Sequence, residues 1–327
     1  MTILVALYSS VAAWNIPAAH VERLRREFPH HTFLHAAGSA DVEAMIPQAD
    51  VAYASELQEQ HFMAAPDLRW VHSSAAGVGG MLTRTVVNSP VVVTNSRGMS
   101  GETIAEHVLA LALALFRKFP LAFRSQTGRR WAQDDALQPP ALRTIKGSRV
   151  LVVGLGGIGA ATAMRFAALG AEVTAVRRRT GLPLPEGVSK VVGDDALMTA
   201  LPSADIIVLA APQTRNTRAL IGHEQFEAMK ADAILINVSR GKLVDEPSMV
   251  SALRRGIIGG AGLDVFEHEP LAPDSDLWEL PNLIITPHVA GFRADHWHAA
   301  TAIFADNLRR FDNGAPLLNV VDKAEGY

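Results

Sequence analysis

The stretch VLVVGLGGIGAATAMRFAALGAEVTAV, residues 150–176, is the strongest indication of the fold in this sequence. A short apolar strand leads into a glycine-rich turn, a helical segment follows, and a second apolar strand ends the stretch. Gly154, Gly156 and Gly159 match G-x-G-x-x-G, in which successive glycines permit a tight turn, approach of a pyrophosphate and close helix–strand packing. A merely structural turn is the alternative, but the two flanking strands favour a dinucleotide site. The predicted contacts are Gly154, Gly156, Gly157, Ile158 and Gly159.

Alternating strand-like and helix-like segments extend on both sides of this unit. Residues 1–100 begin with the apolar run ILVALYS and continue as short strands between amphipathic helices, and a second series of five or six strands starts at SRVLVV. We therefore predict an α/β protein with two doubly wound parallel sheets and a cleft between them. The expected dinucleotide-binding Rossmann domain spans 101–290, and a discontinuous flavodoxin-like substrate domain spans 1–100 and 291–327. The segment 101–119 is predicted to be a helix, followed by a polar excursion over 124–140.

Composition excludes several classes of protein. The 327 residues are 49% hydrophobic and 19% charged with a net charge of −3, which disfavours disorder and a global attraction to nucleic acid or anionic membrane. The longest apolar run, VLALALALF, is too short to cross a bilayer, and we interpret MTILVALYSSVAA as a first strand rather than a signal peptide. Cysteine is absent, which excludes disulfides and thiol chemistry. We expect a cytoplasmic protein.

Three consecutive arginines end the second strand of the glycine unit. Arg177 lies 177 − 159 = 18 residues beyond Gly159, where an acidic residue commonly binds the adenosine ribose, and no Asp or Glu occurs from 173 to 182. Arginine there pairs with a 2′-phosphate, so Arg177, Arg178 and Arg179 predict a preference for NADP(H), with NAD(H) as the other option. A solvated basic turn and a nucleic-acid patch are weaker interpretations.

The downstream segments LINVSRGKLVDEPSMVSALRRGIIGGAGLDVFEHEPL and LPNLIITPHVAG resemble the D-isomer-specific 2-hydroxyacid dehydrogenases, in particular their NADP-dependent glyoxylate/hydroxypyruvate reductases. NSRGMSGETIAEH, IKGSRVLVVGLGGIG, APQTRNTRALIG and NVVDKAEGY extend the resemblance over most of the chain. It implies that Arg240, Glu269 and His288 form the catalytic set.

The chemistry of 2-oxo acid reduction suits these three residue types. Arg240 offers a planar cation for the carboxylate and the polarised carbonyl, and His288 titrates in the range needed of a proton donor. Glu269 would orient the imidazole and raise its pKa. Taken singly, each has an ordinary alternative: a strand-end cap, a turn carboxylate and a core histidine.

The resemblance also implies further contacts. In HSSAAGVGG the backbone of Ala76 and Gly77 would hold the substrate carboxylate, with Arg240 also binding substrate; Gly79 stands where relatives often carry Asp, so the loop departs from the family pattern. The additional cofactor contacts implied are Thr103, Pro212, Thr217, Val238, Ser239 and Asp264.

No metal site is expected. The segment HVAGFRADHWH holds His288, His296 and His298, but residues two apart on a helix do not face one way, and we interpret the other nine histidines as dispersed.

We therefore predict an NADPH-preferring 2-oxoacid reductase that acts on glyoxylate or hydroxypyruvate. The alternatives are a reductase of bulkier acids such as phenylpyruvate and a non-enzymatic dinucleotide-sensing regulator. The resemblance implies a homodimer formed through the cofactor domain, and the apolar face of ETIAEHVLALALALF, residues 102–116, and the excursion that holds Trp131 are the expected contacts.

Overall fold

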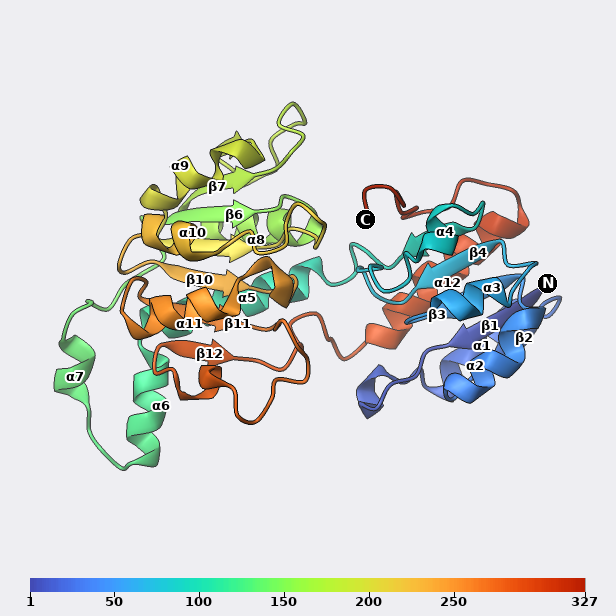
Figure 1. Ribbon diagram of the computed structural model, residues 1–327, viewed down its shortest axis with the longest axis horizontal. Helices are drawn as coiled ribbons and strands as arrows, with labels where there is room; N and C mark the ends of the chain where they lie inside the picture. The colour runs from blue at the N-terminus through green and yellow to red at the C-terminus, as the bar shows by residue number, and fades with distance from the viewer. Residues whose placement is uncertain (327) are drawn as a thin grey trace. The chain divides into compact units, whose positions relative to one another are not determined.

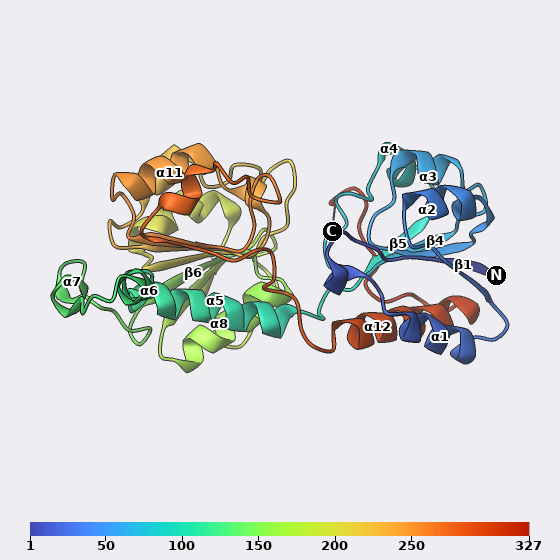
Figure 2. The same ribbon diagram turned by 90° about the horizontal axis from the view of Figure 1, so that it is seen from below.

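The computed structural model describes residues 1–326 and divides into two compact units. The first comprises Met1–Met99 and a segment that begins at Arg293, and the second is Ser100–Phe292. Each unit is a parallel sheet covered by helices on both faces (Figures 1 and 2). The last residue of NVVDKAEGY, Tyr327, lies outside the described residues.

The first unit has a five-stranded sheet in the order β2-β1-β3-β4-β5, the flavodoxin-like order. Its strands are β1 (Thr2–Ala6), β2 (Thr32–His35), β3 (Val51–Ala54), β4 (Trp70–Ser73) and β5 (Val92–Asn95). Its helices are η1 (Ala12–Trp14), α1 (Ala18–Glu27), α2 (Ser39–Met45), η2 (Ile46–Gln48), α3 (Glu59–Met63), α4 (Arg84–Val87) and α12 (His296–Asp312).

Alternation along the strands explains the two helical layers of this unit. In β1, Ile3 and Val5 join a buried cluster with α1 and α12, whereas Leu4 and Ala6 join a cluster with α2 and α3 on the opposite face. Figure 2 shows α1 and α12 on one face and α2, α3 and α4 on the other. Successive side chains of a strand point to opposite faces, so a strand buried on both sides is apolar throughout.

The second unit has a seven-stranded sheet in the order β12-β11-β10-β9-β6-β7-β8. Its strands are β6 (Arg149–Val153), β7 (Glu172–Val176), β8 (Lys190–Val192), β9 (Ile206–Leu209), β10 (Ile234–Asn237), β11 (Gly260–Leu263) and β12 (Leu283–Ile285). The prediction of five or six strands in this unit was therefore too low. The strand that it missed is β8, an edge strand of three residues, which is too short to show a periodic pattern in the sequence.

Helices cover both faces of the second sheet. The helices of this unit are α5 (Gly101–Phe116), α6 (Phe119–Thr127), α7 (Gln133–Leu137), α8 (Gly157–Ala168), α9 (Leu197–Ala200), α10 (His223–Ala228) and α11 (Glu246–Arg254), with 3-10 helices η3 (Asp194–Ala196), η4 (Leu201–Ser203), η5 (Gly241–Leu243) and η6 (Asp276–Glu279). In β6, Val150 and Val152 pack with α5 and α8, and Leu151 and Val153 belong to the cluster beneath α9, α10 and α11.

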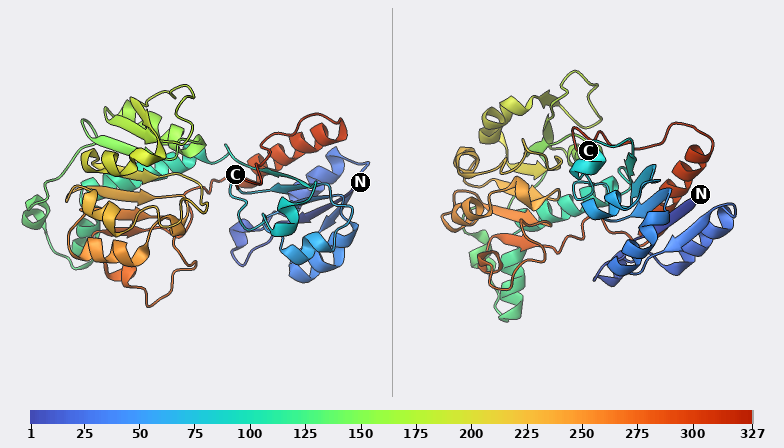
Figure 3. Two further views of the ribbon diagram at one scale, coloured as in Figure 1. Left: turned by 45° about the horizontal axis from the view of Figure 1, so that its top comes forward. Right: turned by 45° about the vertical axis from the view of Figure 1, so that its right-hand side comes forward.

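The predicted helix over 101–119 ends earlier than expected. α5 stops at Phe116, and Lys118 takes a left-handed conformation (φ 55°) before α6 begins at Phe119. The predicted polar excursion begins inside α6 and contains α7, and both helices project from the body of their unit (Figures 1 and 3). Among the described residues, no helix is long and apolar enough to span a membrane.

Candidate active site

The glycine turn between β6 and α8 combines two tightly packed positions with two open ones. Gly154 has φ +98°, and a Cβ there would lie 2.5 Å from the backbone of Ala211. A Cβ on Gly159 would lie 2.0 Å from the carbonyl oxygen of Gly154, so helix and strand are in backbone contact. At Gly156 and Gly157 a Cβ would meet nothing within 4 Å. The exposed face of this helix N-terminus therefore fits a diphosphate, which needs free N–H groups and no side chain in its way.

The arginine run at the end of β7 separates into two kinds of residue. The guanidinium of Arg177 turns back onto its own loop and donates to the carbonyl oxygens of Thr180 (3.5 Å) and Pro183 (3.2 Å), and also to that of Leu182. Arg178 and Arg179 are exposed. Arg177 thus shapes the turn, and the two arginines that follow it lie at the surface.

The predicted catalytic residues follow three neighbouring parallel strands. Arg240 lies just beyond β10, Glu269 in the loop after β11, and His288 beyond β12. Since β10, β11 and β12 are adjacent and parallel, their carboxyl ends share one edge of the sheet. That edge is where open α/β sheets bind ligands.

His288 and Glu269 form a direct pair. Nδ1 of His288 lies 2.6 Å from Oε2 of Glu269, whose Oε1 accepts the backbone N–H of Phe266 at 2.9 Å. Burial by itself raises the pKa of Glu269, but the hydrogen bonds from His288 and Phe266 and the charge of Arg240 outweigh it and lower that pKa. Glu269 is therefore an anion that orients the imidazole, and Nε2 of His288 has no hydrogen-bond partner among residues 1–326.

Arg240 is held in place by its neighbours. Its Nη1 donates to the carbonyl of Ser239 at 2.6 Å, and its own carbonyl accepts from Nδ2 of Asn237 at 2.9 Å. Burial lowers the pKa of Arg240, while the charge of Glu269 acts in the opposite direction. A Cβ on Gly241 would lie 1.8 Å from the carbonyl carbon of Phe266, so the Arg240 loop and the Glu269 loop meet backbone to backbone.

Asp264 organises the segment that carries His288. Its carboxylate is buried and accepts the hydroxyl of Thr286 at 2.7 Å and the N–H groups of Val289 and Ala290 at 3.0 and 2.9 Å. These bonds bracket His288, which takes a left-handed conformation (φ 53°). A left-handed histidine needs this external support because its Cβ disfavours the conformation.

Several residues of this edge were not singled out from the sequence. His107 of α5 lies 3.0 Å from the Thr286 hydroxyl, and Asn237 ties down the Arg240 loop. His107 is 179 residues from Thr286, so no local pattern links them. Gly241, directly after Arg240, could have been recognised from the sequence, because a glycine in a turn can mark a place where two backbone segments come close together.

The remaining predicted contacts lie on loops and helix starts of their units. Thr103 is half-buried in the first turn of α5, and Val238 and Ser239 are buried beyond β10. Pro212 is exposed, and its carbonyl accepts the hydroxyl of Thr217 at 2.7 Å.

Ala76 and Gly77 lie in the other unit, in an exposed loop after β4. Within residues 1–326 their N–H groups donate no hydrogen bond, whereas the Ala76 carbonyl accepts from Asn95 at 2.6 Å. This loop therefore offers two free donors to an anion.

Comparisons with known proteins agree with this geometry. Residues 109–290 match the model of the D-isomer specific 2-hydroxyacid dehydrogenase NAD binding domain. A glyoxylate reductase of Korarchaeum cryptofilum is 35% identical over 80% of this chain and 78% of its own length. A D-3-phosphoglycerate dehydrogenase of Archaeoglobus fulgidus is 31% identical over 92% of this chain, which spans about half of that relative (53%).

Solved structures extend the likeness to the whole fold. The NADPH-dependent glyoxylate/hydroxypyruvate reductase of Sinorhizobium meliloti, solved with NADP and sulfate, is 27% identical with a TM-score of 0.83 and covers 100% of this chain and 99% of its own. The family model covers more than half of the residues, and the relatives align along most of the chain. This protein therefore belongs to the D-isomer-specific 2-hydroxyacid dehydrogenases, a family of oxidoreductases.

Proposed function

We propose that this chain is an NADPH-preferring reductase that converts small 2-oxo acids of the glyoxylate and hydroxypyruvate class to D-2-hydroxy acids. The observation that carries the proposal is the 2.6 Å pair between His288 and Glu269, on the same sheet edge as the half-buried Arg240. This arrangement joins a proton donor, an orienting anion and a fixed cation, which are the groups that carbonyl reduction requires.

The residues divide the chemistry among themselves. When bound, the nicotinamide supplies the hydride. Arg240 binds the carboxylate and polarises the carbonyl of the 2-oxo acid, so that negative charge on the oxygen is stabilised as the C=O bond opens. His288, held at Nδ1 by Glu269, delivers the proton of Nε2 to that oxygen. In the oxidation direction, Nε2 accepts the hydroxyl proton.

Substrate size is the second part of the proposal. The free N–H groups of Ala76 and Gly77 are assigned to the substrate carboxylate, and Gly79, whose Cβ would meet no atom within 4 Å, adds no side chain to that loop. The names of the K. cryptofilum and S. meliloti relatives support glyoxylate and hydroxypyruvate.

Cofactor choice is assigned to the arginine run. Because Arg177 is engaged with its own loop, we assign the 2′-phosphate to Arg178 and Arg179, which are exposed. We also propose that the protein acts in the cytoplasm. The absence of cysteine is compatible with that location, because a chain without cysteine needs no oxidising compartment to form disulfides.

A panel of 2-oxo acids run in parallel with NADPH and NADH tests the proposal. We expect glyoxylate or hydroxypyruvate to be reduced fastest, with NADPH, and phenylpyruvate poorly. The variant Arg178→Ala with Arg179→Ala should raise KM for NADPH at least about tenfold, through loss of charge-assisted bonds, and leave KM for NADH unchanged. Arg26→Ala, which removes an exposed arginine on α1 of the first unit, is the control. NADH preference in the wild type would refute the cofactor assignment, and phenylpyruvate as best substrate would refute the assignment of size.

A further inference from the structure

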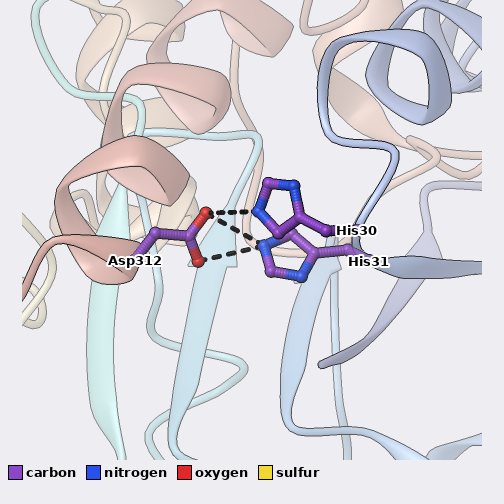
Figure 4. Close-up of side chains that lie close together, drawn as sticks. All are labelled: His30, His31 and Asp312. Carbon is purple, nitrogen blue, oxygen red and sulfur yellow. Dashed lines mark hydrogen bonds and ion pairs between the residues drawn. The ribbon is translucent and has the colours of Figure 1, made fainter.

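A cluster of two histidines and an aspartate lies in the first unit, which does not contain Arg240, Glu269 or His288. His30 and His31 lie in the turn between α1 and β2, and Asp312 is the last residue of α12. Both imidazole rings point their Nε2 atoms at the one carboxylate (Figure 4). His31 and Asp312 are 281 residues apart, and nothing in the sequence indicates that they meet.

The spacing of the three ligand atoms suits a small metal ion. Bonds of about 2.0–2.1 Å to nitrogen and oxygen, arranged as a tetrahedron, place neighbouring donor atoms roughly 3.3 Å apart. Nε2 of His30 lies 3.3 Å from Oδ2 of Asp312, and Nε2 of His31 lies 2.9 Å from Oδ1. All three ligand atoms lie within 4.8 Å of one another. The side chain of His31 is buried, so the side chains of His30 and Asp312 are the ones that would rotate to complete a coordination sphere around an ion.

The cluster is held in position before any ion arrives. The His31 side chain is only 4% exposed and stacks on the buried ring of Phe28, with 6.3 Å between centroids and 18° between planes. The ring centroid of His30 lies 4.1 Å from that of His31. Arg309 lies over Phe28, and its charge is paired with Glu27. One fixed imidazole, one accessible imidazole and a carboxylate thus meet where solvent can reach them.

We propose that His30, His31 and Asp312 bind one zinc ion, with water completing the coordination sphere. Two imidazoles and one carboxylate make a nitrogen and oxygen ligand set, which suits Zn²⁺ rather than the all-oxygen preference of Mg²⁺ or Ca²⁺. The ion replaces the hydrogen bonds that the imidazoles donate to Asp312, and ring protons on Nε2 are released. The ion links the turn after α1 to the end of α12 and stabilises the packing of these two helices within the first unit.

Zinc titration of the full-length, metal-stripped protein without a histidine tag tests this site. Binding is followed by calorimetry and stoichiometry by native mass spectrometry, with Mg²⁺ as the comparison ion. We expect one Zn²⁺ per chain with micromolar affinity, and at least about tenfold weaker binding in His30→Ala and in Asp312→Asn. His223→Ala, which removes an exposed histidine on α10, should bind as the wild type does.

Thermal unfolding supplies a second measurement. Zn²⁺ should raise the Tm of the wild type and of His223→Ala but not of His30→Ala, whose exposed side chain can be removed without opening the core. Circular dichroism checks that each variant is folded. If His30→Ala takes up Zn²⁺ as tightly as the wild type, or the wild type takes up none, the proposal is wrong and the cluster is an ion pair only.

Discussion

At the scale of single residues, the site depends on how one imidazole is presented. Glu269 binds Nδ1 of His288, so a proton can be exchanged only at Nε2. Asp264 holds both flanks of the same residue through Thr286, Val289 and Ala290. His288, the proton donor, is therefore oriented by Asp264 and Glu269, which lie in the loop after the neighbouring strand β11.

Replacing His288 should abolish most turnover without loss of cofactor binding. We expect His288→Asn to lower kcat for 2-oxo acid reduction by about 10²–10⁴-fold, because the general acid is removed. Its dissociation constant for NADPH, measured by fluorescence titration, should stay unchanged. His268→Asn removes an exposed histidine beside Glu269 and serves as control. Activity above a tenth of wild type in His288→Asn would argue against the assignment.

At the scale of elements, different glycines of the turn between β6 and α8 serve the packing of the fold and the binding of the cofactor. Gly154→Ala should destabilise the fold by about 1–3 kcal/mol, since the position has φ +98° and a Cβ would meet the Ala211 backbone at 2.5 Å. Gly156→Ala should keep wild-type stability, because nothing lies within 4 Å, yet weaken cofactor binding by covering the helix N-terminus. Urea denaturation and cofactor titration measure the two effects. Equal stability losses would contradict this division.

The strand β4 carries a buried titratable group that couples stability to pH. His72 is fully buried between the hydroxyls of Thr94 (2.7 Å) and Ser96 (3.2 Å), and desolvation lowers its pKa from 6.5 to about 3. Below pH 6.5 the imidazole of His72 binds a proton in the unfolded chain but stays neutral in the folded chain. The contribution of His72 to the free energy of unfolding is thus full above pH 6.5 and is lost as the pH falls towards about 3.

The expected loss is about 1.4 kcal/mol per pH unit within that window. Between pH 7 and pH 5, His72→Gln should therefore lose about 2 kcal/mol less stability than the wild type, as measured by urea denaturation. The comparison uses the change with pH, so a uniform destabilisation of the variant does not affect it. Parallel pH profiles for the two proteins would show that His72 is not the group responsible.

At the scale of the whole molecule, we propose a homodimer formed through the second unit. The α6–α7 segment exposes large apolar side chains: Phe119 (45%), Phe123 (60%), Trp131 (89%) and Leu137 (63%). The segment stands away from the body of its unit (Figures 1 and 3). Exposed apolar side chains grouped on such a segment are typical of a surface that another chain covers.

Light scattering coupled to gel filtration measures the association. We expect a mass near twice 35.1 kDa for the wild type and a shift to the monomer for Phe123→Ser combined with Trp131→Ser. Met63→Ser, an exposed apolar residue of the first unit, should leave the dimer intact. A monomeric wild type would refute the dimer.

Patterns that lie within a few residues of one another predicted the two parallel α/β sheets and the family, and both are confirmed. The run of strand, glycine turn, helix and strand around Gly154 lies within residues 150–176, so its pattern can be recognised from the sequence. The same reasoning misjudged short or interrupted elements: the three-residue β8 has no periodicity to detect, and the break at Lys118 lies within an otherwise helical pattern.

Which residue types follow each strand along the chain could be predicted from the sequence, since the local hydrophobic pattern marks strands and helices. The contacts that those residues make depend on the tertiary structure. It turned Arg177 onto its own loop, brought the hydroxyl of Thr286 to His107, and joined His31 to Asp312 across 281 residues. The reason is physical: contacts between distant segments depend on how whole elements pack, and neither spacing nor composition encodes that packing.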